Sequence, residues 1–149
     1  MYTKILAPYD ASKYSDKAIE HAIALAKMSG AKLTFVNVTM LPTLIYSFYE
    51  PANTAINEAA ELLLETSEDS ATKAMHLLVT KAKKQGVEAS YVHAVGDPAE
   101  IIIETAKRKK VDLIVMGSRG LHGLARIKAL GSVTRRVVEH AECPILIVH

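Results

Sequence analysis

The sequence has little of what marks several classes of protein. Its 149 residues contain one cysteine, Cys143, which excludes an internal disulfide framework and suits a reducing compartment. A formal net charge of +2 is too small to indicate nucleic-acid binding. No apolar run approaches the roughly 20 residues that cross a membrane, and the N-terminus begins a strand-like stretch rather than a signal peptide. We therefore expect a cytoplasmic protein that binds neither nucleic acid nor membrane.

Chemical motifs are scarce as well. The sequence has no G-x-x-x-x-G-K-[ST] phosphate loop of the kind found in efficient nucleotide hydrolases. Cys143 and His140, near the end of the chain, are too few ligands for a metal site. The stretch from Gly117 to Val138 contains no Asp or Glu that could serve as a base. We therefore predict no resident metal site and no catalytic residue.

Apolar runs alternate with helical patterns along the whole chain. The runs typical of buried strands cover residues 4–9, 33–38, 91–95, 111–116 and 145–148. The helical patterns begin after Ser12, near residue 55, after Asp97-Pro98 and near residue 133. Because a helix separates every two successive strands, we predict one α/β domain over residues 1–149, with a parallel sheet covered by helices on both faces.

The second predicted helix, residues 55–85, is unusually long. Its expected apolar face consists of Ile56, Ala60, Leu63, Ala74, Leu78 and Ala82. The segment 66–70 contains poorer helix formers and predicts a bend. Before this helix, residues 40–51 carry two prolines and three aromatic residues. We interpret that segment as a loop that packs on its own domain; the alternative is a lid or a partner surface.

The stretch with the strongest functional signal runs from Gly117 to Ser132, GSRGLHGLARIKALGS. It follows a predicted buried strand and ends where a helix begins. Glycines let the backbone approach an anion, and a helix N-terminus supplies N–H groups and a partial positive charge. The cations in and after this loop are Arg119, His122, Arg126, Lys128, Arg135 and Arg136. This pattern predicts a polyphosphate site; the alternative is a turn that only reverses the chain.

These motifs resemble the universal stress protein family over the whole chain. The similar elements are the strand that ends at Asp10, FVNV in the second strand, VGDP, VDLIVMGSRG, Gly131-Ser132 and the final CPILIV. The family signature places nine residues between its second and third glycines. Here ten residues, 121–130, separate Gly120 from Gly131, and we interpret the extra residue as an outward bulge because surface loops accept insertions cheaply.

The resemblance implies a doubly wound, Rossmann-like sheet in the order 3-2-1-4-5, with the first and fourth strands adjacent. Because the glycine motif is present, it also implies the ATP-binding branch of the family. Asp10 is then expected at the ribose, Val38 at the adenine and Met116 beneath the nucleoside. The residues expected to hold the phosphates are Gly117, Gly120, Gly131, Ser132 and Val133, with Arg119 and His122 as further basic candidates. Mg²⁺ or Mn²⁺ would accompany the triphosphate.

The resemblance further implies a homodimer joined through the last strand, Ile145, Leu146, Ile147 and Val148, which is short, apolar and otherwise an open edge. Three functions remain open at this stage. The first is an ATP-binding regulatory or interaction module in a stress response. The second is a slow ATP hydrolase or phosphotransfer enzyme that uses Asp10 or Asp97. The third is an interaction module that binds no nucleotide.

Overall fold

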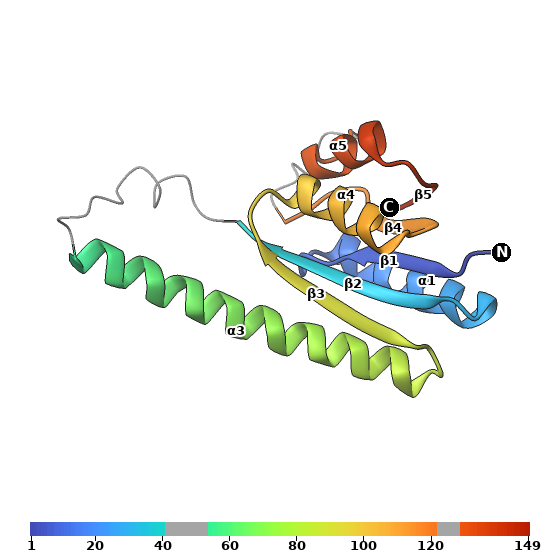
Figure 1. The fold of residues 1–149 in the computed structure, drawn as a ribbon, viewed down its shortest axis with the longest axis horizontal. Helices are drawn as coiled ribbons and strands as arrows, with labels where there is room; N and C mark the ends of the chain where they lie inside the picture. The colour runs from blue at the N-terminus through green and yellow to red at the C-terminus, as the bar shows by residue number, and fades with distance from the viewer. Residues whose placement is uncertain (41–53, 122–128) are drawn as a thin grey trace.

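A computed structural model of the protein describes residues 1–40, 54–121 and 129–149, and its sheet has the predicted topology. The five strands are parallel and lie in the order β3-β2-β1-β4-β5 (Figure 1). Their bounds are β1 (Lys4–Pro8), β2 (Lys32–Thr39), β3 (Ala89–Val95), β4 (Leu113–Gly117) and β5 (Ile145–Val148). The central pair, β1 and β4, joins Ile5 to Leu113 and Leu6 to Ile114. The predicted fold class and strand order are confirmed.

Four helices cover the two faces of the sheet, as the alternation of apolar residues requires. Helices α1 (Lys13–Ser29) and α3 (Thr54–Lys84) pack on one face, and α4 (Pro98–Lys109) and α5 (Ser132–His140) on the other. Within β1, Ile5 faces the first pair of helices and Leu6 the second. Both side chains are almost fully buried, at 1% and 0% exposure. The sheet is therefore apolar on both faces, as parallel sheets are.

Helix α3 differs from the prediction in two respects. It is continuous through all of its 31 residues, with no sharp bend in the ribbon (Figure 1), and within it Thr66 donates its hydroxyl to the Leu62 carbonyl at 2.7 Å. In the first half the expected apolar face is correct for Ala60, which is 7% exposed, but wrong for Leu63 and Ile56, which are 63% and 39% exposed. The cause is length, because the first half of α3 extends beyond the strands (Figure 1). Farther along, Met75 and the predicted Ala82 are fully buried.

The amino edge of the sheet is fixed by one carboxylate. Asp112, just before β4, accepts hydrogen bonds from the backbone N–H and hydroxyl of Thr3, at 2.8 and 2.7 Å, and from the N–H of Lys4, at 3.0 Å. Burial acts to raise the pKa of Asp112, but the bonds from Thr3 and Lys4 outweigh it and lower that pKa. The two central strands are thus tied together at their beginnings, and the turns that follow their ends form the opposite, carboxyl edge.

Candidate functional site

The turn between β1 and α1 places a carboxylate at the carboxyl edge of the sheet. Asp10 Oδ1 accepts the N–H of Ser12 at 3.0 Å, and Ser12 Oγ accepts the N–H of Ser15 at 3.1 Å, which caps α1. Between them, Ala11 has left-handed backbone, with φ of 62°. This conformation is costly for a residue with a side chain. The turn therefore holds Asp10 by one oxygen and leaves the other, Oδ2, for the neighbouring loop.

The three glycines of the motif lie where the chain approaches itself most closely. A β-carbon on Gly120 would lie 2.7 Å from Asp10 Oδ2, and one on Gly117 would lie 2.8 Å from the carbonyl carbon of Tyr14. One on Gly131 would lie 3.2 Å from Arg119 Cα. None of the three glycines has left-handed backbone. Close approach, rather than a special turn, therefore explains why these positions carry no side chain.

These contacts bring together residues that are far apart in sequence. Asp10 and Gly120 lie against each other, so the turns that follow β1 and β4 are adjacent, as predicted. Gly131 also lies beside Gly120, because its missing β-carbon would be 3.6 Å from the Gly120 nitrogen. The two ends of the ten-residue segment between Gly120 and Gly131 therefore meet. Its centre, residues 122–128, which includes the predicted site residue His122, lies outside the described residues.

Helix α5 begins beside Gly120, and no side chain of the described residues caps it. Its N-cap is Gly131, with φ of −62° and ψ of 158°. The N–H of Gly131 itself donates to the Ser118 carbonyl at 2.9 Å, which occupies one of the predicted phosphate donors. Helix geometry gives the next N–H groups, those of Ser132 and Val133, no acceptor within the helix. Together with the exposed Ser132 hydroxyl, they are the donors that α5 presents to an anion.

Ser118, whose carbonyl accepts the N–H of Gly131, is a further residue of the candidate site, and it was not predicted as a site residue. Its residue is 1% exposed, and Ser118 Oγ has no hydrogen-bond partner among the described residues. Its backbone N–H donates to the Val148 carbonyl at 2.8 Å, which joins the end of β4 to β5. The neighbouring Gly117 carbonyl accepts the Thr134 hydroxyl at 2.9 Å, which ties the same strand end to α5.

Arg119 is the described cation of the loop. Its Nε donates to the Ala129 carbonyl at 3.2 Å, which joins the two ends of the loop between Gly120 and Gly131. Its guanidinium lies 5.8 Å from the centre of the Tyr14 ring, and the ammonium of Lys13 lies 5.1 Å from the same ring. Two positive charges thus share one aromatic ring at the beginning of α1. They make this side of the site favourable for an anion.

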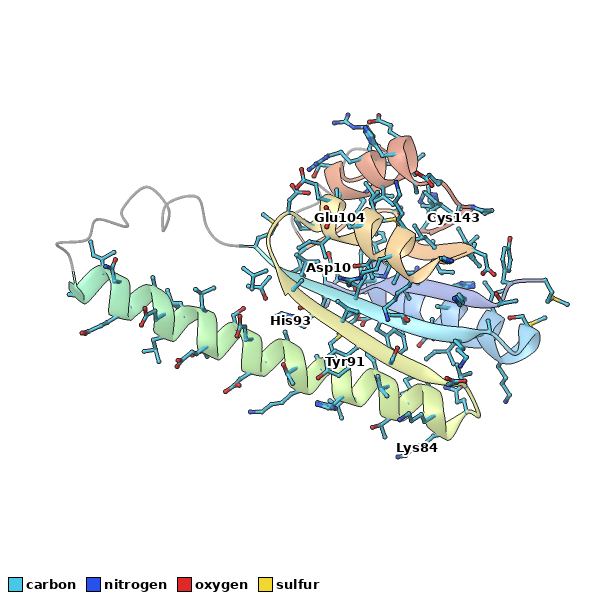
Figure 2. The ribbon with its side chains drawn as sticks, viewed as in Figure 1. Asp10, Lys84, Tyr91, His93, Glu104 and Cys143 are labelled. Atoms are coloured by element: carbon cyan, nitrogen blue, oxygen red, sulfur yellow. The ribbon has the colours of Figure 1, made fainter. Side chains whose placement is uncertain are left out.

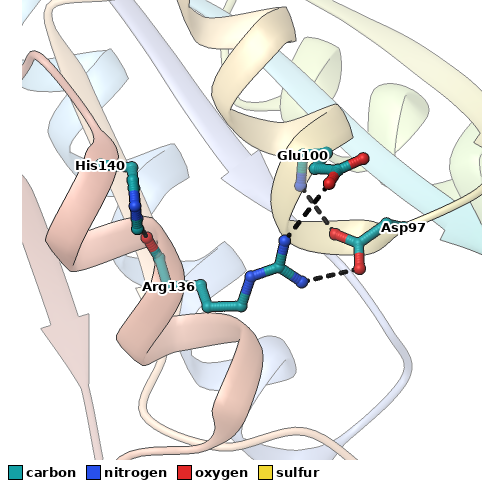
Figure 3. Close-up of polar contacts among 4 residues, drawn as sticks. All are labelled: Asp97, Glu100, Arg136 and His140. Atoms are coloured by element: carbon teal, nitrogen blue, oxygen red, sulfur yellow. Dashed lines mark hydrogen bonds and ion pairs between the residues drawn. The ribbon is translucent and has the colours of Figure 1, made fainter.

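Arg136 has a different role from the one its position in the sequence suggests. Its guanidinium bonds Asp97 Oδ2 at 2.7 Å and lies 3.5 Å from Glu100 Oε1, so it links α5 to α4 (Figure 3). Asp97 in turn caps α4 by accepting the N–H of Glu100 at 2.9 Å. That N–H, and then Arg136, hold the pKa of Asp97 below its ordinary value. Both groups are engaged in joining the two helices.

The two predicted nucleoside contacts lie on the same face of the sheet. Met116 is 4% exposed and belongs to the apolar cluster between the sheet and the helices α4 and α5. Val38, near the end of β2, is half-buried and packs against that cluster. Both therefore have a packing role, whether or not a ligand touches them.

Polar side chains on the face of the sheet that α1 and α3 cover, those of Asn37 and His93, were not predicted as site residues. Asn37 Nδ2 donates to the Tyr9 carbonyl at 2.9 Å, so Asn37 Oδ1 faces His93 Nδ1 at 3.0 Å, and the imidazole nitrogen is the donor of that bond because the amide oxygen has no proton. His93 lies two residues after Tyr91 on β3 (Figure 2). His93 Nε2 is buried without a partner among the described residues. Burial, and then Asp16, raise the pKa of Tyr9. The available signal was the pair of polar residues, Asn37 and His93, within two predicted strands.

Two classes of site can be set aside for the part of the chain that the structure describes. Within residues 1–40, 54–121 and 129–149, no three His, Cys, Asp or Glu side chains lie close enough together to hold a metal ion. No helix there is long and apolar enough to cross a membrane. The carboxyl edge, with Asp10, the glycine loop and the start of α5, remains the candidate site.

Comparison with solved structures shows the same fold in proteins that were crystallised with nucleotides. A universal stress protein in complex with cAMP is similar over 99% of this chain and 97% of its own, with a TM-score of 0.71 and 24% identity. The universal stress protein from Archaeoglobus fulgidus in complex with dAMP is similar over 100% and 98% of the two chains, with a TM-score of 0.62 and 18% identity. At these identities the similarity establishes the fold.

Closer relatives establish the family. The universal stress protein UspA from Lactobacillus plantarum has a TM-score of 0.85 and 27% identity, over 99% of this chain and 98% of its own. Universal stress protein MJ0531 of Methanocaldococcus jannaschii is 37% identical over 148 residues, which cover 99% of this chain and 82% of that protein. YxiE of Bacillus subtilis is 33% identical over 159 residues, with 99% of both chains covered. The model of the universal stress protein family matches residues 1–149. The chain therefore belongs to the universal stress protein family.

Proposed function

We propose that the protein binds ATP at the carboxyl edge of the sheet and acts as a regulatory or interaction module in a stress response. The observation that carries this proposal is the start of α5. It lacks a side-chain cap among the described residues, presents the N–H groups of Ser132 and Val133, and lies beside the glycine loop and Asp10. An anion at that point would complete the helix N-terminus. The cAMP and dAMP complexes of proteins with this fold support an adenine nucleotide as the source of the anion.

Each residue of the edge has a role in this proposal. Asp10 Oδ2, which faces Gly120, would accept a ribose hydroxyl, and Val38 and Met116 would contact the adenosine. The groups around the phosphates would be Gly117, Arg119, Gly120, His122, Gly131, Ser132 and Val133. Because Asp97 is engaged by the Glu100 N–H and Arg136, Asp10 is the carboxylate nearest the glycine loop, and Mg²⁺ or Mn²⁺ would be held chiefly by the phosphates themselves.

Binding is proposed without efficient turnover. A base for hydrolysis must reach the attacking water. Asp97, one of the two candidate carboxylates, is held between the Glu100 N–H and Arg136. We expect phosphate release to be slower than ATP dissociation when both are measured on the same sample. Release faster than dissociation would establish a hydrolase instead.

The proposal is tested by native mass spectrometry of protein purified without added nucleotide, followed by titration with ATP, AMP and GTP. We expect an adenine nucleotide to copurify or, in protein washed free of it, ATP to bind more tightly than AMP because α5 holds the outer phosphates. Protein that is folded, carries no nucleotide and binds none of the three would refute the proposal. It would favour an interaction module that binds no nucleotide.

We also propose the homodimer through β5. This strand forms one end of the sheet order, and its Leu146 is 38% exposed. An apolar edge with free backbone groups favours pairing with a second strand. Leu146→Lys should give monomers in light scattering, and Ile147 is less suitable for the test because it is half-buried. A dimer that persists in the folded Leu146→Lys variant would exclude this edge.

A further inference from the structure

Ser118 is a buried residue whose hydroxyl is left unsatisfied by the described part of the chain. Three other buried hydroxyls at the carboxyl edge each have a partner: Ser12 accepts the N–H of Ser15, Ser15 donates to the Ser12 carbonyl, and Thr134 donates to the Gly117 carbonyl. Ser118 is equally buried, but its Oγ has no partner among the described residues. A hydroxyl removed from water without a hydrogen bond destabilises the fold, so such a group points to a role beyond folding.

The course of β4 fixes the face on which this hydroxyl lies. Successive side chains of a strand point to opposite faces of the sheet. Met116 belongs to the apolar cluster under α4 and α5, and a β-carbon on Gly117 would meet Tyr14 of α1 on the other face. The N–H of Ser118 continues the ladder by donating to the Val148 carbonyl of β5 at 2.8 Å, so the alternation extends to Ser118. Its side chain therefore lies on the face that α5 covers.

The start of α5 lies directly beside Ser118. The Ser118 carbonyl accepts the N–H of Gly131 at 2.9 Å, and a β-carbon on Gly131 would lie 3.7 Å from the same oxygen. Both backbone groups of Ser118 are thus engaged, and the hydroxyl is its remaining polar group. The next two N–H groups, those of Ser132 and Val133, have no acceptor within the helix. The described residues thus bring three donors that lack an acceptor to one end of the sheet, one from the turn after β4 and two from α5.

We propose that the Ser118 hydroxyl donates a hydrogen bond to the phosphate that binds at the start of α5, as a further binding residue of the nucleotide site. This inference rests on the proposed function. A phosphate oxygen is a charged acceptor, and hydrogen bonds to charged acceptors are stronger than those to neutral ones. Because the hydroxyl has already lost its water in the folded protein, the new bond is not offset by dehydration of the donor. Ser118 therefore favours phosphorylated nucleotides over adenosine.

The test compares ATP with adenosine on the wild type and on Ser118→Ala. We expect ATP affinity to fall about tenfold in calorimetry, because one charge-assisted bond is lost, whereas adenosine affinity is unchanged. Inorganic tripolyphosphate, which carries no nucleoside, should raise the melting temperature of the wild type more than that of the variant. Without ligand, Ser118→Ala should melt at the same temperature as the wild type or higher, because alanine removes a buried hydroxyl that has no partner.

Thr134→Val is the matched control. It is nearly isosteric and removes a buried hydroxyl at the same strand end, but one that does have a partner, the Gly117 carbonyl. Thr134→Val should therefore lower the melting temperature of the ligand-free protein, whereas Ser118→Ala should not. A fall in Ser118→Ala as large as that in Thr134→Val would mean that the Ser118 hydroxyl has a structural partner, such as a buried water, and would overturn the inference.

The binding data separate this inference from the proposed function. If the wild type binds ATP and folded Ser118→Ala binds it equally well, the inference fails and the proposed function stands. Equal losses of ATP and adenosine affinity in Ser118→Ala would also overturn the inference, because the hydroxyl would then act on the whole site rather than on a phosphate. A wild type that binds neither ATP nor tripolyphosphate would refute the proposed function, and this inference with it.

Discussion

Among the residues that the structure describes, α1, α4 and α5 each begin in a turn at the carboxyl edge of the sheet, and a side chain caps the first two. Ser12 caps α1 by accepting the N–H of Ser15, and Asp97 caps α4 by accepting the N–H of Glu100. Helix α5 begins at Gly131, which has no side chain with which to do the same. A missing cap costs stability unless another acceptor replaces it. This contrast between described helix starts is the physical basis of the anion site proposed at α5.

The largest effect is expected from Gly120→Val, which removes the space that Asp10 occupies. The new β-carbon would lie 2.7 Å from Asp10 Oδ2, so the carboxylate must turn away from the site. Because Asp10 is flexible at that end, the fold should survive. We expect ATP affinity to fall at least a hundredfold in calorimetry, with a melting temperature close to that of the wild type. Unchanged affinity in the folded variant would remove this loop from the binding site.

Gly131→Asp should close the open helix start and thereby compete with the phosphates. Each lost charge-assisted hydrogen bond costs on the order of 1.5–3 kcal/mol, or about one to two decades in affinity. We expect ATP to bind at least tenfold more weakly, while the melting temperature is unchanged or higher. Gly131→Ala is the matched control, because it makes the same 3.2 Å contact with Arg119 Cα without the carboxylate. Equal losses in the two variants would show that crowding, rather than the cap, is responsible.

Ser12→Ala should lower stability more than ATP affinity, the reverse of Gly131→Asp, because it removes the side chain that caps α1. Loss of an N-cap costs about 1 kcal/mol, and Ser12 is buried at 5% exposure. We expect the free energy of unfolding in urea to fall by about that amount. ATP affinity should change less than in Gly131→Asp. A larger loss of affinity than of stability would mean that the α1 turn, too, is part of the phosphate site.

The smallest effect concerns Asp97→Asn, which keeps a capping side chain but removes the charge that pairs with Arg136. Because the Glu100 N–H and then Arg136 lower the pKa of Asp97, its ionised form stabilises the folded state above the ordinary carboxyl value of 3.8. This contribution is lost as the pH falls through the lowered pKa. Wild type should therefore be more stable than the variant near neutral pH, by less than Ser12→Ala costs, and the difference should vanish in acid. A difference that persists below the pKa of Asp97 would assign it to packing.

Most of the fold could be predicted because it depends on local signals. Alternating strand and helix patterns and the caps at Ser12 and Asp97 specify the elements, and the family resemblance supplies the strand order. The candidate site was predicted only in part. Sequence placed Asp10 near the glycine loop. The engagement of the Gly131 N–H by Ser118 depends on how the start of α5 meets the end of β4, and that of Arg136 by Asp97 depends on how α5 meets α4. No spacing along the chain encodes that geometry.

The misreading of α3 has a different origin. A helical period identifies an apolar side, but it does not say how far the partner surface extends. Here the first half of α3 extends beyond the carboxyl ends of the strands (Figure 1). Leu63, in that half, is therefore 63% exposed. The expected bend at 66–70 is absent because the helix is stabilised as one unit by tertiary packing. The burial of Met75 and Ala82 in the second half outweighs the poor intrinsic propensity of residues 66–70.

The pairing of β1 with β4 also has a consequence for how the chain comes together. Ile5 meets Leu113, so the middle of the sheet closes only when more than two thirds of the chain is present. At translation rates of roughly 5–20 residues per second, β1 waits several seconds with one apolar edge unpaired. Contacts of such long sequence separation also slow the search for the native state. The strand at the centre of the finished sheet is thus the one that stays exposed longest during synthesis, which makes it the segment most in need of protection by chaperones.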